Sequence, residues 1–334
     1  MILAGDIGGT KVNLALYELE ENELKIIAQE QFASKDYAKF SDLIEAFKKS
    51  TSITKVEALC LGIAGPIINE RCRTTNLPWD IKASDLKEQL NTNKVKLLND
   101  LEATAYGMLY LKDDEFISLN PTGREAKGNI AVIAAGTGLG EAILFFDGKD
   151  YHPIGTEGGH TDFAPISSTQ DELLTWLRRR YPGHVSYERI VSGAGIYTIY
   201  EFLLESGFAK EPQAMLNIKE DEDKSAMVSQ CALNNKDPLC LEALRLFAEI
   251  YAAEAGNLAL KCMSLGGVYI GGGIAPKILP ILKSDYFLNS FFSKGRFEEM
   301  LRGIKLKVSL NQETALLGAA RFAFDKLVCL NKID

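Results

Sequence analysis

The chain of 334 residues lacks the features that mark a membrane, secreted or zinc-stabilised protein. No apolar run reaches the about 18 uncharged residues that a membrane-spanning helix needs. The N-terminus has no basic segment followed by an apolar stretch and a cleavage site. The six cysteines are scattered and form no C-x-x-C pair, so neither a disulfide framework nor a zinc site is expected. These absences predict a cytoplasmic protein without a membrane partner, because a reducing cytoplasm is where unpaired cysteines persist.

Positive charge is not in excess either. The 37 Lys and Arg residues are outnumbered by 45 Asp and Glu residues, which gives a formal net charge of -8. One basic run, at residues 178–180, ends an amphipathic helix and is expected to lie in solvent or beside the helix C-terminus. No nucleic-acid partner is therefore predicted. The length exceeds that of a usual single core and predicts two domains.

Two common nucleotide-binding fingerprints are missing where the first glycine-rich segments occur. Neither G-x-x-x-x-G-K-[ST] nor G-x-G-x-x-G is found there, and both would need a helix directly after the glycines. The chain instead has three glycine clusters, namely Gly5-Asp6-Ile7-Gly8-Gly9-Thr10-Lys11, Gly136-Thr137-Gly138-Leu139-Gly140 and Gly271-Gly272-Gly273. Each is a place where the backbone could approach a phosphate closely, because glycine has no Cβ and tolerates positive φ.

The first two clusters are expected to be turns between strands. Apolar and small residues alternate after the first cluster, and apolar runs at 130–134 and 142–146 flank the second. Thr10, Lys11 and Thr137 add hydroxyl or ammonium donors to the backbone N–H groups. A tight hairpin without a ligand is the alternative for either cluster alone. Two matching hairpins, the first of which carries Asp6, favour a phosphate site and point to a kinase.

The third cluster has a different setting. Residues 268–270 predict a strand, Gly271 to Gly273 a turn, and Ala275 the start of a helix with Pro276 in its first turn. Such a turn lets a flat ring or a phosphate approach the backbone. By itself the same pattern describes a plain connection between a strand and a helix.

The remaining pattern alternates strands and helices, as in an α/β protein. Thr169 and Glu172 have capping-box spacing, and residues 314–320 form a small-residue helix that another helix can cross closely. The segment 209–235 shows no clear pattern. The other expected elements are a meander of strands over residues 1 to about 30, a helix over 40–49 with Leu43, Ile44 and Phe47 on one face, strand 56–62, strand 95–98, helix 101–111, helix 172–180 and a core helix over 239–263.

An ordered set of motifs closely resembles the bacterial ATP-dependent glucokinases of the hexokinase, sugar kinase and actin-like superfamily. The set combines the first two glycine clusters with residues 97–100, 157–165, 188–193 and 271–274. The resemblance implies an α/β fold of two RNase H-like lobes, of the actin and hexokinase type, with ATP and sugar bound in an interdomain cleft. It places residues 1–110 and about 300–325 in a small lobe and residues 111–300 in a large lobe.

The resemblance also implies a reaction. The family transfers the γ-phosphoryl group of ATP to the 6-hydroxyl of glucose, giving glucose 6-phosphate and ADP, and uses Mg²⁺. A homodimer is expected on the same ground. Two alternatives stay open, a kinase for another hexose or an amino sugar, and a non-enzymatic sugar-responsive regulator on the same fold. The regulator would need an added DNA-binding domain or a lost catalytic base, and Asp100 is present.

Site residues follow from the matched motifs. Asp100 is the expected catalytic base, since an ionised aspartate can take the proton of the sugar hydroxyl; its alternative role is a helix cap, as for Asn99. Asp6 is expected to hold hydrated Mg²⁺, with a turn aspartate as the alternative. The residues expected to bind the sugar are Asn99, Asp100, Glu157, His160 and Glu188.

The nucleotide is expected to contact all three glycine clusters. Lys11 stands where many members of the family carry asparagine. The residues expected to bind ATP are Gly8, Gly9, Thr10, Lys11, Gly136, Thr137, Gly138, Gly140, Gly271, Gly272 and Gly273.

Overall fold

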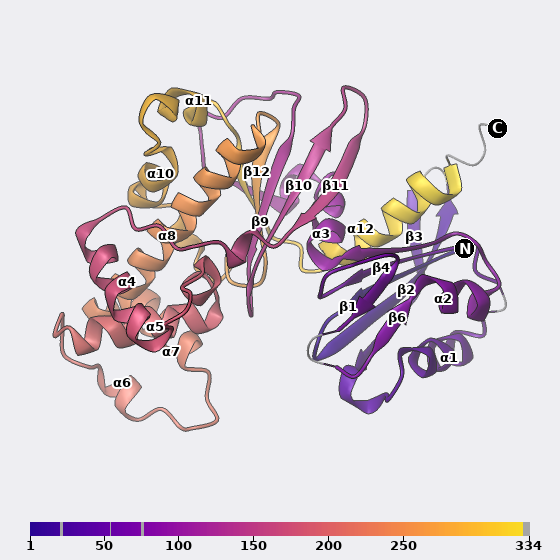
Figure 1. The fold of residues 1–334 in the computed structure, drawn as a ribbon, viewed down its shortest axis with the longest axis horizontal. Coiled ribbons are helices and arrows are strands. Elements are labelled where there is room, and N and C mark those ends of the chain that lie inside the picture. Colours follow the sequence, from indigo (N-terminus) through magenta and orange to yellow (C-terminus); the bar gives the residue numbers. More distant parts are fainter. Residues whose placement is uncertain (21–22, 54, 75–76, 330–334) are drawn as a thin grey trace. The chain divides into compact units, whose positions relative to one another are not determined.

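A computed structural model describes residues 1–20, 23–53, 55–74 and 77–329 of the chain. The chain forms two compact units (Figure 1). The first comprises Met1–Asp113, Tyr151–Gly155 and Asn311–Asp334, and the second comprises Asp114–Asp150 and Thr156–Leu310. The sequence placed the return to the first unit near residue 300, whereas the structure places it at Asn311.

The first unit is built on a five-stranded sheet of order β3-β2-β1-β4-β7. Strands β1 to β3 form an antiparallel meander, and β4 and β7 continue it in parallel with β1. The meander and the hairpin between β1 and β2 confirm the predictions for this region. The strands are β1 (Ile2–Ile7), β2 (Lys11–Glu20), β3 (Glu23–Ala33), β4 (Ala58–Ile63) and β7 (Val95–Asn99), with a separate pair β5 (Arg71–Arg73) and β6 (Asp80–Lys82).

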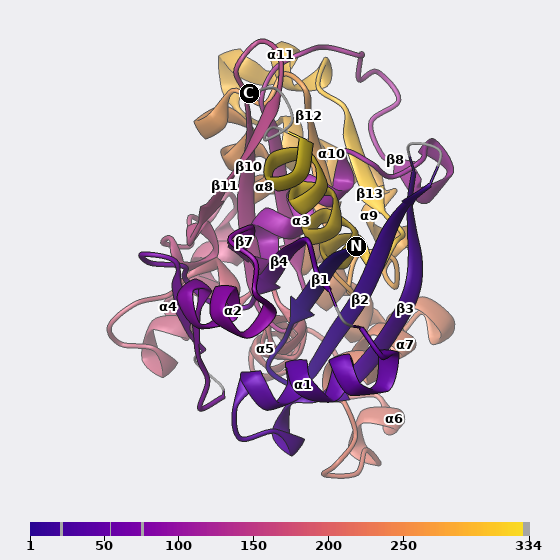
Figure 2. The same ribbon diagram turned by 90° about the vertical axis from the view of Figure 1, so that its right-hand side faces the viewer.

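Helices pack on the sheet of the first unit, and Figure 2 shows α1 against the meander of β1, β2 and β3. The helix predicted over 40–49 is α1, and its residues Leu43, Ile44 and Phe47 are fully buried in the core. The small-residue helix α12 crosses α3 closely: a Cβ built on Gly318 would lie 1.8 Å from the carbonyl oxygen of Ala103. The helical segments are η1 (Ser34–Asp36), α1 (Phe40–Thr51), α2 (Ala83–Leu90), α3 (Asp100–Met108), α12 (Thr314–Phe322) and the π-helix η6 (Ala323–Cys329).

A six-stranded sheet of order β11-β10-β9-β12-β13-β8 is the central sheet of the second unit, and its edge strand β11 contains the segment Tyr151–Gly155 that is grouped with the first unit. Strands β9, β12 and β13 run parallel, and β10 and β8 pair antiparallel with their neighbours. The hairpin predicted around residues 130–146 is confirmed as β9 and β10. The strands are β8 (Phe116–Ser118), β9 (Ile130–Ala135), β10 (Leu139–Phe146), β11 (Tyr151–Thr156), β12 (Gly267–Gly271) and β13 (Leu306–Ser309).

The long helix α8 is the main core helix of the second unit, as predicted, and buries Leu244, Phe247 and Tyr251 completely. Segment 209–235, which the sequence left without a prediction, contains α6 and α7. The helical segments are η2 (Asp113–Glu115), which spans the unit boundary, η3 (Gly158–His160), α4 (Ser168–Arg180), η4 (Tyr187–Arg189), α5 (Gly193–Glu205), α6 (Gln213–Leu216), α7 (Lys224–Asn235), α8 (Pro238–Cys262), α9 (Leu279–Leu282), α10 (Asp285–Phe292), η5 (Gly295–Phe297) and α11 (Glu298–Arg302).

Two local predictions are wrong. Helix α4 begins one residue before Thr169, and its N-cap is Ser167, whose side chain accepts a hydrogen bond from the backbone of Gln170. The helix expected from Ala275 begins only at Leu279, after turns over 275–278. Because Ala275 precedes a proline, the helical conformation is disfavoured there.

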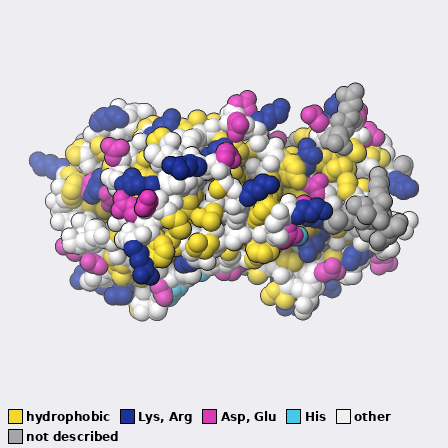
Figure 3. All heavy atoms as spheres, turned by 90° about the horizontal axis from the view of Figure 1, so that it is seen from above, with side chains coloured by type: hydrophobic (Ala, Val, Ile, Leu, Met, Phe, Trp, Pro, Cys, Tyr) yellow, Lys and Arg dark blue, Asp and Glu magenta, His cyan; other side chains and the backbone are white. Residues whose placement is uncertain are grey.

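Charged side chains of both signs are interspersed on the face that Figure 3 shows. Among the described residues, no helix combines the length and the apolar character needed to cross a membrane.

Candidate functional site

The first glycine cluster forms the tip of the hairpin between β1 and β2. The turn is closed by a hydrogen bond from the backbone N–H of Gly8 to the carbonyl oxygen of Lys11 at 3.0 Å. Buried Ser34, the residue directly after β3, donates its hydroxyl to the carbonyl oxygen of Gly8 and its N–H to that of Thr10, both at 3.0 Å. Ser34 therefore fixes the tip, while Gly9, Thr10 and Lys11 are exposed to solvent.

Asp6 lies on β1 directly opposite Asn13 of β2. The Asn13 side chain hydrogen-bonds to the Asp6 carboxylate and in turn accepts a hydrogen bond from the Gln31 amide at 2.9 Å. Burial raises the pKa of Asp6 above its ordinary value, and the hydrogen bond from Asn13 opposes this shift. Asp6 is thus a partly desolvated carboxylate beside the exposed hairpin tip.

A single carboxylate is a suitable partner for a metal ion that arrives with a nucleotide. Within the described ranges, no group of three or more His, Cys, Asp and Glu residues forms a metal cage. Mg²⁺ in kinases takes one or two carboxylates together with phosphate oxygens and keeps several waters. Asp6 fits that ligand set.

Asn99 and Asp100 lie where β7 passes into α3. Asn99 is the N-cap: its Oδ1 accepts a hydrogen bond from the N–H of Leu101 at 2.8 Å, and its own N–H donates to Glu102 Oε2 at 2.7 Å. This capping box assigns the cap to Asn99. Asp100 is the first residue of the helix, and its Oδ1 lies 2.9 Å from the N–H of Leu101.

Asp6 and Asp100 stand at the same edge of the sheet. Asp6 is in register with Gly62 of β4, and Gly62 is in register with Leu98 of β7, two residues before Asp100. Neighbouring strands lie about 4.8 Å apart, so the ends of β1 and β7 are separated by about 10 Å. Ligands of open parallel sheets bind outside the carboxyl ends of the strands, and both aspartates lie at those ends.

The second glycine cluster forms the tip of the hairpin between β9 and β10. The N–H of Gly136 donates to the carbonyl oxygen of Gly138, and the carbonyl oxygen of Gly136 accepts from the N–H of Gly193, both at 2.8 Å. Gly193 is the first residue of α5, so this helix N-terminus lies against the hairpin. A Cβ built on Gly136 would meet no atom within 4 Å, and Thr137 is exposed.

The third cluster lies beside the second. Strand β12 pairs in parallel with β9, so that Gly271 is opposite Ala134. Gly272 has a φ of 83°, and a Cβ there would lie 2.3 Å from the carbonyl oxygen of Ala135. Both its conformation and this contact require glycine. The structure therefore brings together two clusters about 130 residues apart in sequence, at the carboxyl ends of adjacent parallel strands.

Three of the expected sugar-binding side chains form one group in the second unit. His160 Nε2 is 4.0 Å from Glu157 Oε2, and His160 Nδ1 is 4.0 Å from Glu188 Oε1. The His160 and Glu157 side chains are more than half exposed, whereas Glu188 is one-third exposed. Distances of 4.0 Å exceed the length of a hydrogen bond, so the three side chains do not satisfy one another's donors and acceptors.

The two glycines between Glu157 and His160 let their loop lie directly on β10. A Cβ on Gly158 would be 1.9 Å from Glu141 Oε2, and a Cβ on Gly159 would be 2.0 Å from the carbonyl oxygen of Leu139. A larger residue at Gly159 would have to displace backbone, and one at Gly158 would have to displace the Glu141 side chain or the loop.

A cavity of about 390 Å³ adjoins this group and is contained in the second unit. His160 and Glu188 contribute to its wall, which supports a ligand-binding role for both residues. The other lining residues, none of which was expected to bind the sugar, are Arg180, Tyr181, Pro182, Gly183, His184, Ser186 and Arg189.

The geometry can now be compared with known proteins. The family model for glucokinases matches residues 3–326. The glucokinase of a Nostoc species is 38% identical over 334 aligned positions, which cover 96% of this chain and 98% of the relative. The chain belongs to the glucokinase family. The resemblance drawn from the motifs is thereby confirmed.

Solved structures of glucokinases share the fold. A glucokinase from an Antarctic psychrotroph superposes with a TM-score of 0.83 at 30% identity, over 99% of this chain and 98% of that one. A more distant glucokinase from Streptomyces griseus, of the ROK family and solved in complex with glucose and AMPPNP, gives a TM-score of 0.61 at 19% identity, over 96% and 98% of the two chains. The predicted α/β sugar-kinase fold is confirmed.

Proposed function

We propose that this member of the glucokinase family transfers the γ-phosphoryl group of ATP to the 6-hydroxyl of glucose. The observation that carries the proposal is the placement of Asp6 and Asp100 at one sheet edge, beside an exposed glycine hairpin. One carboxylate near the attacking hydroxyl and another near the phosphates are what phosphoryl transfer to an alcohol requires.

Asp100 is the proposed general base. Its neighbours Asn99 and Glu102 form the capping box of α3, so the Asp100 carboxylate is not needed as the N-cap. An ionised carboxylate there accepts the proton of the 6-hydroxyl as the hydroxyl oxygen attacks the γ-phosphorus. The Asn99 amide donates to the carbonyl oxygen of Gly65 at 3.2 Å, which orients this side chain for a sugar hydroxyl.

The glycine hairpins are the proposed phosphate-binding elements. Exposed backbone and side-chain donors of Gly9, Thr10 and Lys11 on the first hairpin, and of Thr137 on the second, suit phosphate oxygens. Gly272 lets a nucleotide approach the backbone beside Ala135. Asp6 is the proposed ligand of hydrated Mg²⁺, which when bound would offset phosphate charge during transfer.

Glucose recognition is proposed for Glu157, His160 and Glu188 together with Asn99 and Asp100. Carboxylates accept hydrogen bonds from sugar hydroxyls, and imidazole both accepts and donates. The exposed cluster around His160 and the adjacent cavity support this role. We also propose a cytoplasmic homodimer, by resemblance to the family, which light scattering on the purified protein would test.

The function is tested by a coupled assay across a panel of hexoses, amino sugars and phosphoryl donors. A misplaced hydroxyl leaves a polar group of the site unpaired, at about 1 to 3 kcal/mol, so glucose should exceed galactose and fructose by about 5- to 150-fold in kcat/KM. ATP should exceed ADP and polyphosphate as donor. Equal efficiency with the three hexoses would contradict glucose specificity, and preference for glucosamine would favour an amino-sugar kinase.

A further inference from the structure

A buried acid lies directly beneath the loop that carries Glu157 and His160. Glu141 of β10 is only 1% exposed, and its Oε2 fills the space where Gly158 has no Cβ. Thr156 joins the loop to the same strand: its hydroxyl donates to the carbonyl oxygen of Glu141 at 3.0 Å and accepts from the N–H of Gly158 at 3.1 Å.

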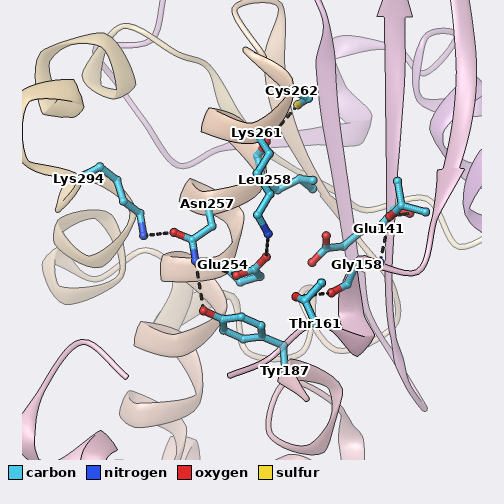
Figure 4. A network of polar contacts seen from close by, with 11 residues as sticks. Glu141, Gly158, Thr161, Tyr187, Glu254, Asn257, Leu258, Lys261, Cys262 and Lys294 are labelled. Carbon is cyan, nitrogen blue, oxygen red and sulfur yellow. Dashed lines mark hydrogen bonds and ion pairs between the residues drawn. The ribbon is translucent and has the colours of Figure 1, made fainter. Parts of the chain in front are cut away.

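A second acid, Glu254 of α8, is completely buried on the other side of Glu141. Figure 4 shows the Glu141 carboxylate turned toward Glu254 and Lys261. Both carboxylate oxygens of Glu254 have a partner. Lys261 Nζ lies 3.0 Å from Oε1, and the Asn257 amide donates a hydrogen bond to Oε2 at 2.8 Å. The same amide nitrogen lies 3.1 Å from the hydroxyl of Tyr187, the residue before Glu188.

The Glu141 carboxylate lacks such a pair of partners. Within the described part of the chain its Oε1 has no hydrogen-bond partner. Burial raises the pKa of Glu141 to about 8, the nearby Glu254 carboxylate adds to the shift, and Lys261 opposes it. The other titratable groups around the two acids are Tyr251 and Cys262, which interact electrostatically with Glu141, and Tyr187 and Lys294, which interact with Glu254.

We propose that Glu141 is a positioning residue for the sugar-binding loop: as a neutral acid it supports Gly158 and holds Glu157 and His160 in place, and its ionisation displaces the loop. An unpaired buried carboxylate is costly to desolvate and is repelled by Glu254. Gly158 lies over the carboxylate, so movement of the loop is the route by which water reaches it. The inference depends on the proposed function only in assigning this loop to the sugar.

The decisive comparison is the pH dependence of glucose binding. Calorimetry from pH 7 to pH 9.5 should show a wild-type Kd for glucose that rises above about pH 8, approaching tenfold per pH unit. Glu141→Gln keeps the size but cannot ionise, so its Kd should stay constant over the same range. Glu249→Gln is the matched control, because Glu249 lies on α8, has a pKa raised by burial, and pairs with Arg245 instead of the loop. Its pH dependence should equal that of the wild type.

Two readouts without sugar separate this inference from the proposed function. Infrared difference spectra at pH 7 should contain the carbonyl band of a protonated carboxylic acid that is absent from Glu141→Gln. Amide exchange over 157–161, corrected for intrinsic rates, should speed up above about pH 8 in the wild type and not in Glu141→Gln. A missing band, or the same exchange profile in both proteins, would overturn the inference even if glucose is phosphorylated. Both signals present without glucose binding would overturn the proposed function and leave the loop support standing.

Discussion

Glu188 Oε2 accepts a hydrogen bond from the backbone N–H of Leu139 at 3.1 Å. Leu139 follows Gly136-Thr137-Gly138 of the second hairpin, and a Cβ on Gly138 would lie 2.4 Å from the same carboxylate oxygen. The other oxygen of Glu188 faces His160 at 4.0 Å. One carboxylate therefore joins the proposed sugar-binding group to a proposed phosphate-binding hairpin within a single unit.

This link predicts that Glu188→Ala affects both substrates. Loss of a hydrogen bond to a charged group costs about 1.5 to 3 kcal/mol, so the KM for glucose should rise by about 10- to 150-fold. The KM for ATP should also rise, by several-fold, because the hairpin loses the acceptor of the Leu139 N–H. Glu157→Ala is the control and should raise only the KM for glucose. Steady-state kinetics with glucose and ATP varied in turn would measure both KM values. A KM for ATP in Glu188→Ala equal to that of the wild type would show that the hydrogen bond from Leu139 to Glu188 has no role in ATP binding.

The crossing of α3 and α12 makes a prediction about stability. Gly318→Ala would place a Cβ 1.8 Å from the carbonyl oxygen of Ala103 and 2.6 Å from the N–H of Gly107. Backbone atoms cannot retreat as a flexible side chain does, so the free energy of unfolding should fall by about 1 to 3 kcal/mol or more. Calorimetric Tm values would measure the loss. Gly183→Ala is the control, since no atom lies within 4 Å of its Cβ, and an equal Tm for the two variants would refute the packing argument.

The spacing of apolar and glycine residues along short segments predicted the hairpins and helices that this spacing itself determines. The alternation after Gly9 and the apolar runs around Gly138 gave both hairpins, and the spacing of Leu43, Ile44 and Phe47 gave the face of α1. The helix expected at Ala275 failed because proline was read as a helix start, although it also restrains the residue before it.

Contacts between distant segments could not be predicted. Ser34 reaches Gly8 only because β3 returns along β2, and Glu141 lies under Gly158 only because the loop folds back onto β10. The capping box at Asn99 did have a local signal, since Glu102 follows at the required spacing. The catalytic and binding roles came from resemblance and stay predictions.

The raised pKa of Glu141 also predicts how stability depends on pH. Its folded-state pKa of about 8 exceeds the ordinary value of 4.5, so between these values the folded protein keeps a proton that the unfolded chain releases. The stabilisation is complete below about pH 4.5 and declines as pH rises to about 8, by at most about 1.4 kcal/mol per pH unit. Denaturant titrations at several pH values should show a smaller decline for Glu141→Gln. Identical slopes for variant and wild type would contradict the assignment.

Asp6→Asn tests the proposed metal ligand. An amide is a weaker ligand for a hard cation than a carboxylate, so the Mg²⁺ concentration needed for half-maximal activity should rise. Glucose affinity measured without nucleotide should stay near the wild-type value, because Asp6 bonds to Asn13 in the sheet and is not among the proposed sugar ligands. Magnesium titrations of activity give the first quantity and calorimetry the second. An unchanged Mg²⁺ requirement would remove Asp6 from the proposed metal site.

Asp100→Asn tests the base directly. The substitution keeps the size of the side chain but removes the proton acceptor, so kcat should fall by about 10² to 10⁴. Glucose affinity should change far less, since the amide still meets a hydroxyl. Tm should stay near the wild-type value because Asn99 and Glu102 form the capping box of α3. Asn99→Ala should instead lower the Tm, because loss of the helix cap reduces the free energy of unfolding by about 1 kcal/mol. If Asp100→Asn kept most of its turnover, or lost activity only by unfolding, the base would have to be another residue; a folded, glucose-binding and nearly inactive variant would assign the proton transfer to Asp100.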